Sequence, residues 1–397
     1  MPVAVWIVII AGAVIVSVGL GVRQTFGLFL SPMSIDLGIG RETFGFALAL
    51  QQIAWGAFQP LMGAIADRHG SGRVIAIGLM GYVAGLFVMG HATAAWHLDL
   101  GAGLLIGFAL SGTSFAVVLG SVGRVVAPEK RSLAFGIATS GGSFGQFIMA
   151  PVGQQLIAGW GWQGALLIMA GMTALMLPFA WPLRGRAAVT AGKREQTIAE
   201  ALREAAGHGG FWYLNAGFFV CGVQIVFIAV HLPAFVSDYG LSASVGAAAL
   251  ALIGFFNIIG SWGSGILGDK YSKKYLLSGL YFVRSVATVL FLFAPKTEAV
   301  VLVFASVMGL LWLGTVPLTS GLVAQIFGVR YMGTLFGIVF FSHQLGSFLG
   351  AWLGGLVFDT TGSYDLMWWL SIALGLVATV LHLPIADKPI HRPVAAT

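Results

Sequence analysis

Acidic side chains are absent from the interiors of the long hydrophobic runs in this chain. All 14 Asp and Glu residues fall at the ends of such runs, between them or near the C-terminus. An intramembrane enzyme would need paired carboxylates, a nucleophile with its base or a metal pair, and the eight histidines form no HExxH motif. We therefore expect no catalytic site, no metal, no cofactor and no enzymatic activity. Cation efflux normally uses an Asp or Glu within the membrane, so the same absence argues against it.

Charge and cysteine are also scarce. Only 9% of the 397 residues are charged and 58% are hydrophobic, with a mean hydropathy of +0.93, whereas a soluble domain carries about 25% charged residues. The composition excludes a soluble globular protein. The single cysteine, Cys221, excludes a disulfide framework within the chain and a multi-cysteine metal site. The opening MPVAVW lacks a charged n-region, so we expect a retained first helix rather than a signal peptide.

Hydrophobic runs of roughly 20 residues recur along the chain, and each can cross about 30 Å of hydrocarbon as a helix. Barrel strands alternate over about 10 residues, so these runs predict an all-α membrane protein. The twelve expected spans are 6–30, 43–64, 74–93, 100–122, 133–157, 162–182, 211–236, 244–267, 275–294, 299–323, 333–358 and 366–384. Glycines at four-residue spacing predict close helix contacts at Gly141 and Gly145, and at Gly346, Gly350 and Gly354.

The polar stretch between the sixth and seventh spans predicts a division into two bundles. We expect an N-terminal six-helix bundle at 1–183, a cytoplasmic linker at 184–210 with a surface helix at 194–206, a C-terminal six-helix bundle at 211–384 and a cytoplasmic tail at 385–397.

Basic residues set the orientation. Of the 20 Lys and Arg residues, 16 fall in the loops and tail on one side, and only Arg41 and Lys296 on the other. This bias predicts that both termini are cytoplasmic. The net charge of +6 then faces anionic lipid, so a bilayer is an expected partner and nucleic acid is not. We expect a monomer in the bacterial inner membrane.

The remaining two basic residues, Arg23 and Arg284, lie inside spans. A buried cation without a buried anion needs a partner, and a soluble organic anion would be one. Arg23 lies past the middle of the first span, where it binds the substrate carboxylate or snorkels to the headgroups. Arg284 lies near the middle of the ninth span, where it is a second carboxylate clamp or pairs with carbonyls of a neighbouring helix.

His343 is the candidate for proton coupling, because histidine titrates near physiological pH. It lies about ten residues into the eleventh span, and the alternative is a neutral hydrogen bond between helices. His231 is expected at the membrane interface. The other residues that we expect to bind substrate are polar or aromatic residues on spans: Gln52, Gln146, Gln224, Asn257, Trp312 and Gln344.

The two halves of the chain repeat. GAIADRHGSGR at 63–73 recurs as GILGDKYSKK at 265–274, which places Asp67 and Asp269 at an offset of 202 residues. A second match relates Gly136 and Gly337 at an offset of 201 residues. Parallel repeats of six spans with a site between them at mid-membrane are a transporter architecture.

The first of these loops resembles the signature of the major facilitator superfamily, G-x-x-x-D-R-x-G-x-x-R, on Gly63, Asp67, Arg68, Gly70 and Arg73. The resemblance implies two pseudo-symmetric six-helix bundles and a charge network on the cytoplasmic face that holds the outward-open state. We therefore expect gating residues in this loop, its second copy and the segment before the fifth span: Gly63, Asp67, Arg68, Arg73, Asp269, Lys270 and Arg131.

A narrower resemblance is to the monocarboxylate-transporter-like branch. The motif of that branch entering the fifth span is matched here by Lys130, Arg131, Leu133, Ala134, Gly136, Ala138, Gly141 and Gly145. The resemblance implies alternating-access transport of a small carboxylate, with protons as the coupled partner in a symport. The eighth span departs from that branch, with Asn257 and Ser261 where an Asp/Arg pair is frequent. The alternative functions are an organic anion exchanger or an efflux carrier for drug-like amphiphiles.

Overall fold

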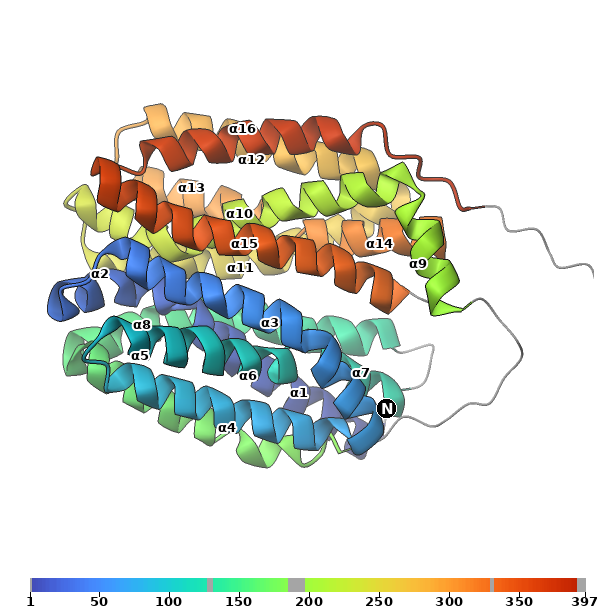
Figure 1. Cartoon of the computed structure of the whole chain (residues 1–397), viewed down its shortest axis with the longest axis horizontal. Coiled ribbons are helices and arrows are strands. Elements are labelled where there is room, and N and C mark those ends of the chain that lie inside the picture. The colour runs from blue at the N-terminus through green and yellow to red at the C-terminus, as the bar shows by residue number, and fades with distance from the viewer. Residues whose placement is uncertain (1, 127–130, 185–196, 329–331, 391–397) are drawn as a thin grey trace, which may run out of the picture.

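The computed structural model describes residues 2–126, 131–184, 197–328 and 332–390, and its long helices lie side by side along one axis (Figure 1). Side chains of some helical residues, among them Asp67, Arg68 and Arg131, lie outside the described part. The elements are α1 Val3–Gln24, α2 Phe26–Leu37, α3 Arg41–His69, α4 Ser71–Gly90, α5 Ala95–Leu98, a π-helix Asp99–Leu105, α6 Ile106–Thr113, α7 Phe115–Val125, α8 Arg131–Ala174, a 3-10 helix Leu177–Ala180, α9 Ile198–Ala206, α10 Gly209–Asp238, α11 Ala243–Lys270, α12 Lys273–Phe293, α13 Glu298–Leu311, α14 Thr315–Phe327, α15 Met332–Thr361 and α16 Asp365–His382.

The predicted spans coincide with these helices. Ten stretches of the described residues are long and apolar enough to cross a membrane. One of them, 137–180, overlaps two predicted spans, because Gly161 has a φ of 67° and interrupts α8 between them. The predicted span 43–64 lies within α3. The all-α membrane fold of twelve spans in two pseudo-symmetric bundles is therefore confirmed.

Each half of the chain builds its own hydrophobic core. One cluster of buried apolar side chains comes almost entirely from residues 8–183, and the other almost entirely from residues 205–385. Figure 1 shows the blue-to-green half below the yellow-to-red half. The domain limits at 183 and 211 stay a prediction.

Glycines bring helices into backbone contact, as predicted. A Cβ atom added to Gly145 of α8 would overlap the Ser17 carbonyl of α1, and one added to Gly346 of α15 would overlap the Phe219 carbonyl of α10. Such close approach is the usual reason for small residues between membrane helices, where packing replaces the hydrophobic driving force. The first contact lies within the N-terminal bundle and the second within the C-terminal bundle.

Two tyrosines reveal the internal symmetry of the bundles. The Tyr82 hydroxyl of α4 donates a hydrogen bond to the Gly19 carbonyl of α1 at 2.8 Å. In the other half, the Tyr281 hydroxyl of α12 donates to the Gly217 carbonyl of α10 at 2.7 Å. The third helix of each half is thus bonded to the first in the same way, which agrees with the duplication seen in the sequence.

The surface helix predicted at 194–206 is present as α9, and its first residues 194–196 lie outside the described part. Thr197 caps α9: its hydroxyl accepts from the Glu200 amide, while the Glu200 carboxylate accepts from the Thr197 amide. The indole of Trp212 donates to the Ala206 carbonyl at 2.9 Å, which fixes α9 to the start of α10.

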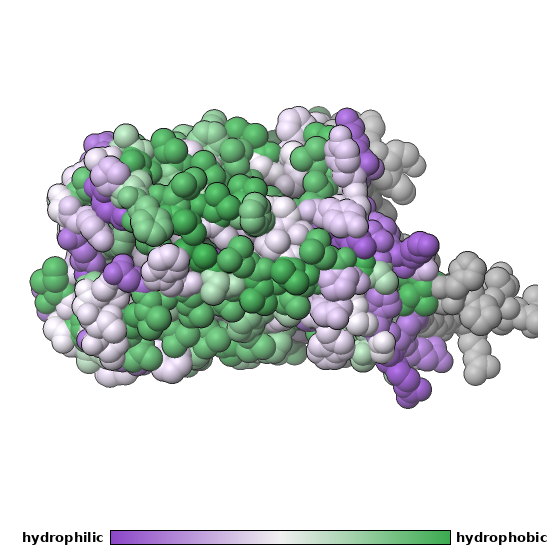
Figure 2. Space-filling view, turned by 90° about the horizontal axis from the view of Figure 1, so that it is seen from above, coloured by the Kyte–Doolittle hydropathy of each residue, from purple (hydrophilic) through white to green (hydrophobic). Residues whose placement is uncertain are grey.

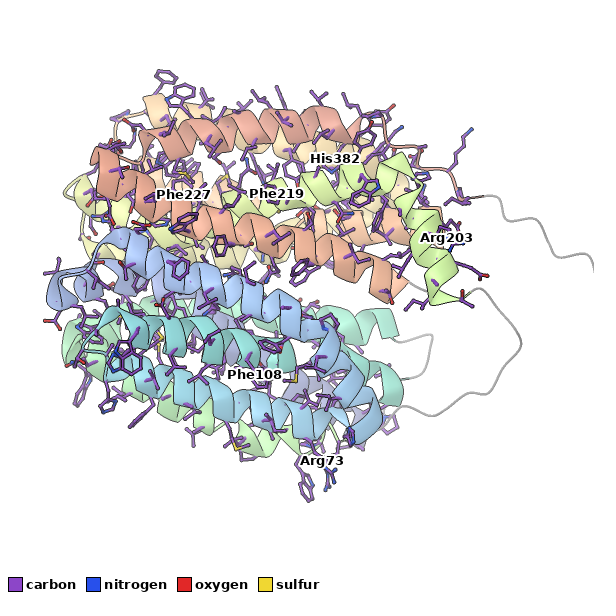
Figure 3. The ribbon with its side chains drawn as sticks, in the orientation of Figure 1. Arg73, Phe108, Arg203, Phe219, Phe227 and His382 are labelled. Atoms are coloured by element: carbon purple, nitrogen blue, oxygen red, sulfur yellow. The ribbon has the colours of Figure 1, made fainter. Side chains whose placement is uncertain are left out.

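The two ends of the molecule differ in charge. The basic end carries Arg73 and Arg203, labelled in Figure 3, and the ends of α3, α9 and α11. The acidic end carries Asp238 and Asp359, where α10 and α15 finish. A hydrophobic band lies between the two polar ends (Figure 2), as a bilayer-spanning protein requires.

The bundles touch at the acidic end and separate towards the basic end. The main contacts pair α3 with α15 and α8 with α11, and Figure 1 shows α3 and α15 diverging to the right. Near the middle, the Trp55 and Phe340 rings pack edge to face at 5.7 Å. Closer to the basic end, a Cβ added to Gly63 or to Gly337 would meet no described atom within 4 Å.

Candidate functional site between the two bundles

A cavity lies at the interface of the bundles. It is a small, partly open space. The N-terminal bundle contributes the end of α1, the start of α2 and the middle of α3, and the C-terminal bundle contributes α10. Its lining residues are Arg23, Gln24, Phe26, Gly27, Leu48, Gln51, Gln52, Val226, Ala229 and Val230.

Arg23 supplies the charge of this cavity. It occupies the last turn of α1, and its Nε atom is buried without a hydrogen-bond partner among the described residues. The guanidinium lies over the Trp55 ring, 5.3 Å from the ring centroid. The Trp55 indole in turn donates to the Ser114 hydroxyl at 3.3 Å, which fixes the ring in place. Arg23 is thus held by stacking while its Nε–H stays free for a ligand.

Three glutamines surround Arg23, and they differ in what their amides do. Gln51 donates to the Ala102 carbonyl at 2.9 Å, so its amide nitrogen is occupied. Gln344 Nε2 of the other bundle donates to the Gln52 side-chain Oε1 at 3.5 Å and to the Gln52 backbone carbonyl at 3.3 Å. Gln24 is 3% exposed, and its Nε2 atom has no partner among the described residues. The sequence interpretation missed Gln24, although it directly follows the buried arginine inside an apolar run.

The opposite wall of the cavity is apolar. The lining residues from α10 are Val226, Ala229 and Val230, and the described lining contains no carboxylate. The start of α2 lies directly against this wall, because a Cβ on Gly27 would overlap the Ala229 carbonyl. The cavity therefore offers nitrogen donors on one side and aliphatic surface on the other.

His343 lies next to the cavity rather than in its lining. Its ring stacks on Phe340 at a centroid distance of 5.9 Å, and Nδ1 lies 3.2 Å from the Gln344 Oε1 atom and 3.3 Å from the Ser347 hydroxyl. Gln344 connects it onward to Gln52 in the cavity wall. A hydrogen-bonded chain therefore links the histidine with the cavity.

Arg284 lies away from the cavity, inside the C-terminal bundle. It is fully buried, and Nε donates to the Leu311 carbonyl at 3.0 Å, while Nη2 donates to the Leu311 and Trp312 carbonyls. Nη1 donates to the Cys221 sulfur at 3.4 Å. These carbonyls are free because the helix is interrupted between α13 and α14. The contacts match the second alternative, pairing with a neighbouring helix, and leave no free edge for a carboxylate clamp.

The remaining predicted binding residues lie outside the described lining of the cavity. Asn257 donates to the Ser143 hydroxyl at 3.1 Å, which joins α11 to α8 across the interface. Gln224 donates to the Ser371 carbonyl within its own bundle, and Trp312 is buried at the break between α13 and α14. Gln146 is 6% exposed, with an Oε1 atom that has no described partner. Their substrate contacts stay predictions.

The predicted gating residues gather at the basic end. Gly63 lies near the end of α3 with open space around it, Arg73 is exposed in α4, and Asp269 and Lys270 are exposed at the end of α11. The side chains of Asp67, Arg68 and Arg131 lie outside the described residues. The charge network expected here therefore stays a prediction.

A clamp that the sequence interpretation missed closes the acidic end. Arg41, the first residue of α3, holds both carboxylate oxygens of Asp238 at 2.6 Å and donates to the Tyr364 hydroxyl at 3.0 Å. Asp359 accepts from the backbone N–H groups of Arg41 at 3.1 Å and Glu42 at 2.7 Å. One bundle thus caps the N-terminus of a helix in the other. We call these five residues the acidic-end clamp.

The clamp shifts the ionisation of its members. Burial alone would lower the pKa of Arg41, but hydrogen bonds to Asp238 and Tyr364 raise that pKa above its usual value. Burial raises the pKa of Tyr364 well above its ordinary value. Arg41 therefore stays charged and Tyr364 stays neutral over the physiological range.

His231 lies directly behind the clamp, and its expected position at the membrane interface stays a prediction. It is 1% exposed. Its Nε2 atom lies 2.8 Å from the Ala351 carbonyl and its Nδ1 atom 3.2 Å from the Tyr364 hydroxyl. The side chain joins α10 to α15, so a hydrogen-bonding position inside the protein accounts for a histidine near this end.

Comparison with known proteins places this geometry in a family. The sequence matches the Major Facilitator Superfamily over residues 9–351 and 264–397. It is 26% identical to the uncharacterized MFS-type transporter YcxA of Bacillus subtilis (strain 168), over 92% of this chain and 91% of that protein. It is 27% identical to monocarboxylate transporter 12 of Mus musculus, over 76% and 71%, and 25% identical to monocarboxylate transporter 13 of Bos taurus, over 98% and 92%.

The fold agrees with solved structures. A bacterial homolog of the human lysosomal transporter Spinster, in an inward-facing and unoccupied conformation, superposes with a TM-score of 0.80 at 14% identity, covering 99% of this chain and 100% of that one. The chain belongs to the Major Facilitator Superfamily as a secondary transporter, and within that family it is similar to the monocarboxylate-transporter-like branch, as its sequence predicted.

Proposed function

We propose that this protein transports a small monocarboxylate, and that the cavity around Arg23 is its substrate site. The main support is the buried Arg23 Nε atom, which has no hydrogen-bond partner among the described residues. Arg23 lines a cavity whose described lining holds no carboxylate. A guanidinium at this depth is costly without a counter-ion. An organic anion supplies one, and arginine binds carboxylate with charge-assisted hydrogen bonds.

The two walls of the cavity favour one charged group per substrate. Arg23 can bind a carboxylate, while Val226, Ala229 and Val230 offer only aliphatic surface. A second carboxylate would lie against this wall without a partner, which is strongly unfavourable at low dielectric.

The arrangement of the bundles supports alternating access. If the basic end is cytoplasmic, as the positive-inside rule requires, the structure is closed towards the outside by the acidic-end clamp and separated towards the cytoplasm. Opening the clamp while the basic end closes would expose the same cavity to the other side. The cavity is built from both bundles, so this rocking motion changes its access.

Proton coupling is part of the proposal, with His343 as the proton carrier. Hydrogen bonds through Gln344 connect His343 to Gln52, which lines the cavity. Protonation at His343 would make the surroundings of the cavity more positive and raise anion affinity. By linkage, the bound anion would raise proton affinity equally, which gives symport. An anion exchanger is the second candidate, and it would show no such coupling.

Uptake into proteoliposomes tests the proposal. Purified protein would be reconstituted and supplied with radiolabelled L-lactate, pyruvate, succinate or tetraphenylphosphonium, with and without an inward proton gradient. We expect saturable uptake of a monocarboxylate, enhanced by the gradient, and none of the dicarboxylate or the cation. Uptake of the cation alone would overturn the proposal. Monocarboxylate uptake that ignores the gradient would establish the exchanger or a uniporter instead of the symporter.

A further inference from the structure

The cavity contains a second free donor beside Arg23, on a residue with no assigned role. Gln24 is 3% exposed, and its Nε2 atom has no hydrogen-bond partner among the described residues, like Arg23 Nε. Both residues line the same cavity, and they are consecutive in the last turn of α1. The end of α1 therefore holds two buried nitrogen donors without a described partner, on two residues that line one cavity.

Leaving such donors unpaired is costly. A buried amide N–H without an acceptor has lost its hydrogen bonds to water without replacement, and buried polar groups in folded proteins are generally paired. The neighbouring glutamines show that this bundle can pair its amides, since Gln51 donates to the Ala102 carbonyl. Gln24 lacks such an internal acceptor among the described residues. An acceptor that arrives from outside would remove the cost.

The chemistry of that acceptor follows from the set of donors. One cationic N–H and one neutral N–H call for a group with two acceptor oxygens and negative charge, and a carboxylate has both. The protein itself does not supply this carboxylate at the cavity, because the described lining contains no Asp or Glu. Resting on the proposed function, we infer that Gln24 is a substrate-binding residue, whose amide holds the second oxygen of the carboxylate bound by Arg23.

A role in the fold would leave different traces from a role in binding. The Gln24 amide nitrogen makes no hydrogen bond to a described residue, so replacement of Gln24 by the similarly sized Leu removes an unpaired buried group. We expect Gln24→Leu to leave the melting temperature of the free protein unchanged or slightly higher. Only the response to ligand should fall.

The experiment measures melting temperature and affinity in detergent. Wild type, Gln24→Leu and Gln24→Glu would be titrated with sodium L-lactate and sodium pyruvate, against sodium chloride at equal ionic strength, and apparent affinities taken from the stabilisation curves. Loss of one hydrogen bond to a charged group corresponds to about ten- to hundredfold weaker binding. We expect this for Gln24→Leu. Gln155→Leu, at an exposed position of α8 outside the cavity, is the matched control and should bind as wild type does.

Gln24→Glu tests the same residue with a side chain of nearly the same size and shape as glutamine. It would place a carboxylate where we expect that of the substrate, so it should pair with Arg23, raise the melting temperature of the free protein and abolish the response to lactate and pyruvate. If both variants respond to these acids as wild type does, the inference is overturned while the proposed function stands. If Gln24→Leu lowers the melting temperature of the free protein and keeps full affinity, Gln24 is structural. If wild type itself responds to neither acid, the proposed function fails together with the inference.

Discussion

Arg41 and Asp238 form a two-pronged ion pair, with both N–O distances at 2.6 Å, and it joins the first residue of α3 in one bundle to the last residue of α10 in the other. The two residues are 197 positions apart in the chain. A contact of this kind must break whenever the bundles part at the acidic end. It therefore biases the protein towards the state in which that end is closed.

Removing Arg41 should shift this balance. Exposed or half-exposed ion pairs contribute up to about 1 kcal/mol, which corresponds to a roughly fivefold change in an equilibrium. We expect Arg41→Ala to increase labelling of an engineered Val230→Cys by an impermeant maleimide about fivefold from the acidic side. Cys221 is the only native cysteine and is buried, so we expect the maleimide to label the engineered cysteine rather than a native one.

Two variants control for this result. Lys296 is the other basic residue of that end. Among the described residues it donates to the Leu292 and Ala294 carbonyls of its own bundle, so Lys296→Ala should leave labelling unchanged. Exchange of charges in Arg41→Asp with Asp238→Arg should restore slow labelling. Equal labelling in Arg41→Ala and its parent would show that the ion pair does not hold the gate.

The clamp should be insensitive to pH in the physiological range. A group with a raised folded-state pKa contributes stability that is complete below its ordinary pKa and lost only as pH rises through the raised value. The ordinary pKa values of Arg41 and Tyr364 lie at about pH 10 or above, and both pKa values are raised in the folded protein. Labelling of Val230→Cys, corrected for the reactivity of free thiol, should change less than about twofold between about pH 6 and about pH 9. A larger change would mean that another group controls the gate.

Proton coupling should depend on His343 instead. His343→Gln keeps a hydrogen-bonding side chain but cannot titrate. We expect this variant to lose accumulation of lactate driven by a pH gradient while it still exchanges labelled for unlabelled lactate. Accumulation at the wild-type level in proteoliposomes would exclude His343 as the proton carrier.

Arg284 should behave as a structural residue. Arg284→Gln would leave the Leu311 and Trp312 carbonyls without their donor, and an unpaired buried group costs about 1–3 kcal/mol. We expect a lower melting temperature, with the lactate affinity of the remaining folded protein within about threefold of wild type. A stable variant with selectively lost lactate binding would restore the carboxylate-clamp interpretation.

The contrast between Arg23 and Arg284 shows where sequence interpretation reaches its limit. Both arginines interrupt hydrophobic spans, so the sequence predicted a role for each at similar depth. Their environments differ because the helix break after Leu311 supplies free carbonyls to Arg284, while the described residues supply no acceptor to the Arg23 Nε atom. Such a break depends on packing between helices, and the hydropathy of a predicted span contains no information about that packing.

The fold itself was largely predictable, because a run of about 20 apolar residues in a bilayer has almost no alternative to a helix. The repeat between Asp67 and Asp269 and the loop signature gave the architecture. Contacts between distant positions were not predictable in this way. Arg41, Asp238 and Asp359 each look like ordinary residues at the end of a span, and only the closed arrangement of the bundles brings them together.

Equilibrium binding of radiolabelled L-lactate or pyruvate to purified wild type, Arg23→Lys and Arg23→Gln tests the central claim most directly. Lysine keeps the charge without the planar fork, so it should bind more weakly than arginine, while glutamine removes the charge. Arg203→Gln, an exposed position of α9, serves as the control for loss of a positive charge. We predict saturable binding by wild type and the control, weaker binding by Arg23→Lys and none by a folded Arg23→Gln. Undiminished binding by Arg23→Gln would contradict the assignment of this cavity as the substrate site.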